Sequence, residues 1–299
     1  MSEVTVLIPL DGSKPAELPI SLLRALKPLG DLRVRLLSVS EAGEGADEDR
    51  LLQAAEGYID KTCARVEATY GVLVEGICRT GTAYAEILEE AGRPEVNLLL
   101  LSTHGRSMSD DPERIGGVAD KVIRGAPCPT LLVGPRASVP LQIGLITVPL
   151  DGSRLAAEAL PVAKVMAERL GSRLRLVQAI QAPASLEADS SGSLATDLVN
   201  SQELTASLYL SEAKLELETA QPVETEVLFG LPAAVLVQDL REHRPDLVIM
   251  TSHGRTGFIR WALGSVTDRL IRSKVPVLVL RPMDVMGDRL KSLEVANQA

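Results

Sequence analysis

The chain has 299 residues, of which 45% are hydrophobic and only 2% are aromatic, and its formal net charge is −9. The length allows two domains of ordinary size, while the acidic balance and the scarcity of aromatic side chains argue against nucleic-acid binding. The three separated cysteines form no C-x-x-C pair, and the chain shows neither a leader pattern nor an apolar stretch of roughly 18 residues. These features predict a cytoplasmic protein without zinc knuckles, a disulfide framework or a membrane span.

The first half is predicted to alternate strands with helices. Strands are expected at residues 4–10, 34–39, 72–78, 98–101 and 130–133. Helices are expected at residues 15–29, 51–70, 81–91 and 117–124. Such alternation is typical of the α/β class, in which helices cover both faces of a parallel sheet.

The pattern then begins again. VPLDGSR from Val148 repeats IPLDGSK from Ile8, and DLVIMTSHGR from Asp246 matches NLLLLSTHGR from Asn97. Matches in the same order along the whole chain indicate a duplicated domain rather than a short-period solenoid. The join is GPRASVP, so the domains are predicted to span residues 1–139 and 140–299. The second half is expected to place a helix at residues 200–217 and its last two strands at 247–250 and 277–280.

Two loops in each half are candidates for a ligand site. Five strands of this kind most often take the order 3-2-1-4-5, which makes strands one and four neighbours at the switch point of a doubly wound sheet. Asp151 follows strand one of the second half, and a glycine loop from Thr251 to Ser265 follows strand four. We expect the two to converge, because the carboxyl ends of parallel strands lie at the same edge. A carboxylate for a base or ribose and backbone N–H groups for phosphates suit a nucleotide.

Plainer interpretations also fit these loops. Asp-Gly-Ser after a strand is often only a turn with a helix N-cap, and Gly254 and Gly264 are also explained by close packing. The chain contains neither the dinucleotide fingerprint nor a P-loop, so NAD and P-loop chemistry are not supported. His104 and His253 have no serine, cysteine or carboxylate at a spacing that indicates a catalytic site, and the sequence shows no cluster of metal ligands. We therefore expect no catalytic residues and no protein metal site.

The segment TSHGRTGFIRWALGSVT, residues 251–267, resembles the ATP-binding signature of the universal stress proteins, G-x2-G-x9-G-[ST]. Thr251 stands where the signature has its first glycine. LIRSKVPVLVL and VPLDGS are similar to that family as well, and the resemblance extends over two tandem copies. It implies two doubly wound five-stranded domains of the adenine nucleotide alpha-hydrolase-like type. It also implies that Val277–Leu280 pairs with Thr130–Leu132 or with a second chain.

By position, the resemblance implies an ATP site in which Mg²⁺ screens the phosphates. Its adenine and ribose pocket would comprise Pro149, Leu150, Asp151, Ala179, Met250 and Thr251. Its phosphate cradle would comprise Gly254, Arg255, Gly264, Ser265, Val266 and Thr267. The corresponding residues of the first half are Pro9, Leu10, Asp11, Val39, Gly105, Gly116 and Gly117.

Three functions follow as hypotheses. The first is a nucleotide-dependent regulator of the stress response that binds ATP with little or no hydrolysis, forms a pseudo-dimer within the chain and has a homodimer as a further option. The second is an adenylate-processing enzyme, and the third is a nucleotide-free dimerisation scaffold. We expect the first-half site to be the weaker, because Gly117 and Ala119 replace the hydroxyl residues Ser265 and Thr267.

Overall fold

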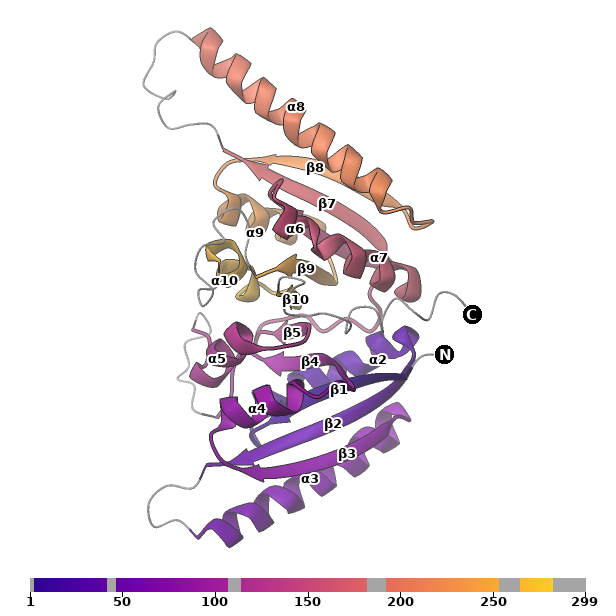
Figure 1. The fold of residues 1–299 in the computed structure, drawn as a ribbon, viewed down its shortest axis with the longest axis vertical. Coiled ribbons are helices and arrows are strands. Elements are labelled where there is room, and N and C mark those ends of the chain that lie inside the picture. Colours follow the sequence, from indigo (N-terminus) through magenta and orange to yellow (C-terminus); the bar gives the residue numbers. More distant parts are fainter. Residues whose placement is uncertain (1–2, 42–46, 107–113, 182–191, 253–263, 282–299) are drawn as a thin grey trace.

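The computed structural model describes residues 3–41, 47–106, 114–181, 192–252 and 264–281. The described strands form one ten-stranded sheet that runs through both halves of the chain (Figure 1). The strands are β1 Glu3–Leu10, β2 Asp31–Ser40, β3 Leu73–Thr80, β4 Val96–Ser102, β5 Thr130–Val133, β6 Leu145–Leu150, β7 Arg173–Ile180, β8 Val223–Phe229, β9 Leu247–Thr251 and β10 Val277–Leu280. The helices are α1 Lys14–Glu17, α2 Leu23–Leu26, α3 Glu48–Tyr70, α4 Ala83–Ala91, α5 Gly117–Gly125, α6 Arg154–Ala157, α7 Ala159–Leu170, α8 Gly192–Glu216, α9 Pro232–His243 and α10 Ser265–Ile271.

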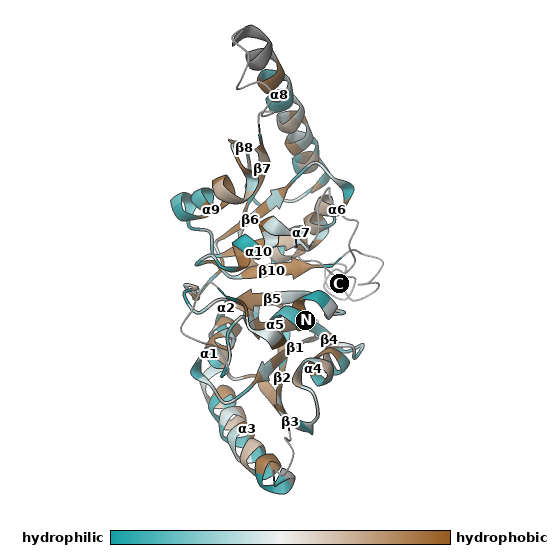
Figure 2. Ribbon diagram, turned by 90° about the vertical axis from the view of Figure 1, so that its left-hand side faces the viewer, coloured by the Kyte–Doolittle hydropathy of each residue, from teal (hydrophilic) through white to brown (hydrophobic). Residues whose placement is uncertain are grey.

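The sheet has the order β3-β2-β1-β4-β5-β10-β9-β6-β7-β8. Within each half the strands are parallel and take the order 3-2-1-4-5, so the predicted doubly wound fold is confirmed. The halves join where β10 lies beside β5 (Figure 2) and pairs with it in antiparallel orientation, with Val277 opposite Leu132 and Val279 opposite Thr130. The expected pairing through the last strands is therefore made inside the chain.

Each face of this sheet carries its own apolar layer, and both layers cross the junction between the halves. The seven residues of β4 are all buried, as expected of a strand covered on both faces. On one face Leu131 and Leu278 belong to the core that α2 and α7 cover. On the other face Leu132 and Val277 belong to the core under α4, α5, α9 and α10. The junction is thus packed like the interior of a single domain.

Two predicted helices differ from the structure. The helix expected at residues 15–29 is broken into α1, a 3-10 segment Leu18–Leu22, α2 and a second 3-10 segment Lys27–Leu29. Both 3-10 segments have a proline in their first turn, and a proline lacks the N–H that a continuous α-helix needs. The helix expected to begin near Asn200 already begins at Gly192. Of the described helices, none combines the length and the apolar character that crossing a bilayer demands.

Candidate functional site

The Asp-Gly-Ser turn after the first strand of each half is both a helix cap and a fixed carboxylate. Asp11 Oδ1 accepts a hydrogen bond from the backbone N–H of Ser13 at 2.9 Å, and the Ser13 hydroxyl accepts one from the first turn of α1. Asp151 and Ser153 repeat these contacts at the start of α6. The turn interpretation is therefore correct, and it holds each aspartate at the carboxyl edge of the sheet.

In the first half this carboxylate meets the loop after β4. Asp11 Oδ2 accepts a hydrogen bond from the backbone N–H of Arg106 at 2.6 Å, although 95 positions separate the two residues. The Arg106 guanidinium donates to the carbonyl of Asp11 as well. A side chain at Gly105 would collide with the same carboxylate, which explains the glycine at that position. The predicted convergence of the two loops is confirmed for the first half.

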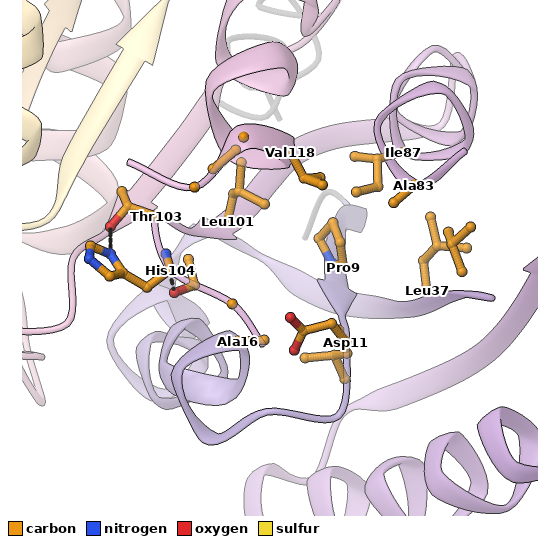
Figure 3. Close-up of a pocket in the computed structure, with 17 residues that line it drawn as sticks. Pro9, Asp11, Ala16, Leu37, Ala83, Ile87, Leu101, Thr103, His104 and Val118 are labelled. Carbon is orange, nitrogen blue, oxygen red and sulfur yellow. Dashed lines mark hydrogen bonds between the residues drawn. The ribbon is translucent and has the colours of Figure 1, made fainter. Parts of the chain in front are cut away.

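A cavity of about 110 Å³ lies between these loops and α4 (Figure 3). All seven first-half residues proposed from the sequence line it: Pro9, Leu10, Asp11, Val39, Gly105, Gly116 and Gly117. The backbone N–H of Gly116 donates to the carbonyl of Thr103 at 2.9 Å, which holds the start of α5 against the end of β4. The cavity therefore has a carboxylate on one side and a helix start on the other.

Sequence reasoning missed the apolar wall of this cavity. Leu37 comes from β2, Ala83 and Ile87 from α4, and Val118 from α5 (Figure 3). Ala83 and Ile87 lie one helical turn apart, so the amphipathic pattern of α4 was the signal that pointed to this face. These residues give the cavity the apolar lining that is common in small-molecule sites.

His104 lines the same cavity, but its surroundings are those of a structural residue. Its side chain is buried, and Nδ1 lies 2.8 Å from the Thr103 hydroxyl, as Figure 3 shows. Its backbone N–H donates to the hydroxyl of Ser102. A loop histidine bonded to backbone is the structural role that the sequence favours for His104, and the structure shows its ring nitrogen beside a side-chain hydroxyl instead. His253, the corresponding residue of the second half, lies outside the described residues.

The second half repeats the arrangement as far as it is described. Gly264 donates its N–H to the Ser252 carbonyl at 3.2 Å, the counterpart of the contact made by Gly116. Ser265 is exposed and Val266 is half-buried at the start of α10. The remaining proposed residues lie at the ends of β6, β7 and β9: Pro149, Leu150, Asp151, Ala179, Met250 and Thr251. Gly254 and Arg255 lie outside the described residues.

Thr267 takes a different place from the one expected of a phosphate ligand. Its side chain is buried, and its hydroxyl lies 3.5 Å from the carbonyl oxygens of Thr251 and Ser252. The Thr267 side chain therefore connects the first turn of α10 to the end of β9. Ser265 is the hydroxyl residue that this helix start exposes.

One group of potential metal ligands occurs among the described residues, away from both loops. Glu226, Asp239 and His243 bring their ligand atoms within 4.8 Å of one another. The guanidinium of Arg175 already forms ion pairs with both carboxylates, and its distance to Asp239 is 2.6 Å. A resident positive charge makes this a buried ion-pair network rather than a cation site.

Comparison with known proteins agrees with this architecture. The model of the universal stress protein family matches the chain twice, at residues 5–134 and 144–281. The chain belongs to the universal stress protein family. A universal stress protein of Methanocaldococcus jannaschii is 30% identical over 139 residues, which cover 46% of this chain and 81% of that protein. One from Mycobacterium tuberculosis is 28% identical over 200 residues, or 62% of each chain.

The fold of this tandem universal stress protein is found in a solved structure of similar extent. The crystal structure of a universal stress protein from Archaeoglobus fulgidus has a TM-score of 0.68 and covers 93% of this chain and 98% of its own. The sequence identity is 20%, so this likeness shows the fold alone. The two family matches coincide with the two sheet halves that meet at β5 and β10.

Proposed function

We propose that this universal stress protein is an ATP-dependent regulator that binds the nucleotide at the carboxyl edge of its second half. The observation that carries the proposal is the meeting of the strand-one aspartate with the loop after strand four, seen in the first half as the bond from Arg106 to Asp11. The second half has the same turn at Asp151 and the same contact between helix start and strand end at Gly264. The carboxylate would bind the base or ribose, and the loop would bind the phosphates.

Differences between the two halves favour unequal affinities for ATP. The first-half cavity of about 110 Å³ is smaller than the few hundred cubic ångströms of most ligand pockets. The start of α10 offers the exposed hydroxyl residue Ser265, where the start of α5 has Gly117. We expect the second half to bind ATP with a micromolar dissociation constant, about 8 kcal/mol of binding free energy. We expect the first half to bind it at least about tenfold more weakly.

Mg²⁺ fits this proposal only as a companion of the phosphates. Asp11 is the one carboxylate in the described lining of the first-half cavity, and its oxygens are engaged as hydrogen-bond acceptors. Mg²⁺ keeps several waters and is commonly held through phosphate oxygens with few protein ligands. The ion would therefore offset phosphate charge, and this chain's contribution would be to orient the nucleotide.

The proposal is tested by releasing bound nucleotide from the heat-denatured purified chain and identifying it by mass spectrometry. ATP should be recovered, with no more than about one equivalent per chain. Recovery of no nucleotide, together with no heat of ATP binding in calorimetry, would favour the dimerisation scaffold instead.

Hydrolysis is proposed to be negligible, well below about 1 s⁻¹, which is the low end of ordinary enzyme turnover. His104 is buried, and its Nδ1 is already engaged with the Thr103 hydroxyl at 2.8 Å. Turnover should be measured as phosphate release under saturating ATP and Mg²⁺. Sustained turnover that disappears in a His253→Ala variant would establish the adenylate-processing alternative.

A further inference from the structure

A hollow of about 600 Å³ opens at the opposite edge of the sheet, at the amino ends of β9 and β10. Five segments contribute to it: the linker between the halves, the C-terminal half of α9, the turn between α9 and β9, the end of α10 and the turn before β10. Its apolar floor contains Val237, Leu240 and Val275. This volume lies within the range of small-molecule sites. The hollow shares no described lining residue with the first-half cavity.

The hollow is lined mainly by positive charges, whereas the chain as a whole is negatively charged. Six cationic side chains line it, and the lining contains one carboxylate, although the whole chain has a formal net charge of −9. The cationic residues are Arg136, Arg241, Arg244, Arg269, Arg272 and Lys274. We refer to this feature as the basic hollow. A concave cluster of one sign raises the local concentration of the opposite charge.

Most of this charge is not neutralised by the described part of the protein. Arg272 forms an ion pair with Asp268 at 2.8 Å. Asp246, the carboxylate of the lining, accepts the backbone N–H groups of Gly144 and Leu145 instead of binding a cation. Four of the cationic residues form no ion pair with any described carboxylate: Arg241, Arg244, Arg269 and Lys274.

The helix dipole alone does not account for this cluster. Cations are favoured near helix C-termini, so basic residues in the last turns of α9 and α10 are unremarkable one at a time. The duplicated half supplies a comparison, because α4 is the counterpart of α9. The last turn of α4 contains no basic residue, whereas the last turn of α9 contains Arg241 and His243. The fold therefore does not require cations at this helix end, and in the second half Arg241 lines the hollow.

We propose that the basic hollow is a second binding site, for a compact small molecule that carries two or more phosphate groups. Arginine guanidinium groups bind phosphate in a bidentate manner, and several such groups around one concavity suit several phosphates at once. The confinement of the cations to one hollow and the acidity of the rest of the protein favour a small anion over a nucleic-acid strand, which needs an extended basic track. The site is independent of ATP binding at the carboxyl edge.

The test uses inorganic tripolyphosphate and isothermal titration calorimetry on the full chain. The informative variant is Arg241→Ala combined with Lys274→Ala, which removes two exposed cations from different segments of the hollow. The matched control is Arg24→Ala combined with Lys27→Ala, two exposed cations of the first half that do not line the hollow. A single Arg241→Glu variant repeats the test by charge reversal, and thermal unfolding verifies that each variant is folded.

Tripolyphosphate affinity should fall at least about tenfold in the double variant and in Arg241→Glu, because charge-assisted phosphate contacts are lost. It should be unchanged in the control, and ATP affinity should be unchanged in all three variants. Equal tripolyphosphate binding by the hollow variant and the wild type would overturn the proposal. So would loss of tripolyphosphate binding in Gly264→Val, since the anion would then occupy the nucleotide site. Tighter competition by decaglutamate or a ten-nucleotide DNA strand would assign the hollow to an acidic peptide or to nucleic acid.

Discussion

The two halves of this universal stress protein share one architecture and differ in the residues that lie at the carboxyl ends of their strands. Both hold the strand-one aspartate in an Asp-Gly-Ser turn with the same hydrogen bonds. In the first half the backbone N–H of Arg106 donates to the Asp11 carboxylate and the Arg106 guanidinium donates to the Asp11 carbonyl, while the corresponding Arg255 lies outside the described residues. In the second half α10 begins with the exposed hydroxyl residue Ser265 where α5 begins with Gly117. The duplication therefore preserved the scaffold while the chemistry of one edge diverged.

Each half also contains a buried ion-pair network, and the two networks correspond to each other. Arg35 on β2 lies 2.6 Å from Glu90 on α4, and Arg175 on β7 lies 2.6 Å from Asp239 on α9. The side chains of Glu90 and Asp239 are 0% and 2% exposed, so their charges depend on these partners. This shared network suggests that each half relies on the same contact to fasten its fourth helix to its second strand.

The largest expected effect tests whether the two ion-pair networks stabilise their halves equally. Glu90→Gln and Asp239→Asn should each lower the free energy of unfolding by about 3 kcal/mol, because each takes the fully buried carboxylate away from a buried arginine and leaves it only more exposed partners, Glu75 for Arg35 and Glu226 for Arg175. Urea unfolding followed by circular dichroism measures the loss. Glu242→Gln, an exposed change on α9, is the control and should cost less than about 0.5 kcal/mol. A large loss in one half only would show that the halves are not equivalent in their stability.

The next effect separates the halves at the nucleotide site. Gly264→Val should abolish measurable ATP binding, a loss of at least about 100-fold. A Cβ atom at residue 264 would lie 3.2 Å from the Ser252 carbonyl, and the added methyl groups would block the approach of phosphate. The counterpart Gly116→Val should leave the affinity of the tight site unchanged. Calorimetry on both variants decides the matter, and unchanged affinity in Gly264→Val would refute the site.

A third experiment asks which aspartate serves the nucleotide. Asp151→Ala should weaken ATP binding about tenfold or more, because a hydrogen bond to a charged group is lost. Asp11→Ala should change the affinity of the tight site by less than about twofold, since Asp11 lines the first-half cavity rather than the second-half site. Loss of ATP binding in Asp11→Ala instead would assign the tight site to the first half. A titration that shows two equal ATP sites per chain would contradict the proposed difference between the halves.

The smallest expected effect concerns two tyrosines in corresponding positions of α3 and α8. The Tyr58 hydroxyl donates to Glu17 at 2.8 Å, whereas the buried Tyr209 hydroxyl has no hydrogen-bond partner among the described groups. Tyr58→Phe should cost about 1 kcal/mol, and Tyr209→Phe should be neutral or slightly stabilising. Thermal unfolding of both variants measures the difference. A larger loss in Tyr209→Phe would contradict this assignment.

The same tyrosines predict a pH dependence with a defined sign. Burial, together with the bond to Glu17, raises the pKa of Tyr58, and burial with the nearby charge of Asp151 raises the pKa of Tyr209. A raised pKa means that the folded state holds the proton more tightly, so its stabilisation is fully present below about pH 10 and is lost as pH rises above it. Tyr58→Phe should accordingly reduce the alkaline loss of stability.

The sequence by itself determined the strands, the duplication and the positions of the two marked loops. Apolar runs such as 247–250 and 277–280 are strong signals, because a strand buried on both faces has no polar alternation to obscure it. The strand order followed from the connection rules of doubly wound sheets. The meeting of Asp11 with the loop at Gly105 and Arg106 followed in turn from that order.

Only the tertiary structure decided the features that depend on which surfaces meet. The edge of β10 suits β5 and a second chain equally well as a pattern of backbone groups, and the fold selects β5. The burial of Thr267 and the closure of Arg106 over Asp11 are side-chain choices that spacing does not encode. The basic hollow is the clearest case, since its cations come from a linker and two helix ends far apart in the sequence. Local propensity fixes each segment, whereas the packing of the linker, α9, α10 and the turn before β10 around one hollow brings these charges together.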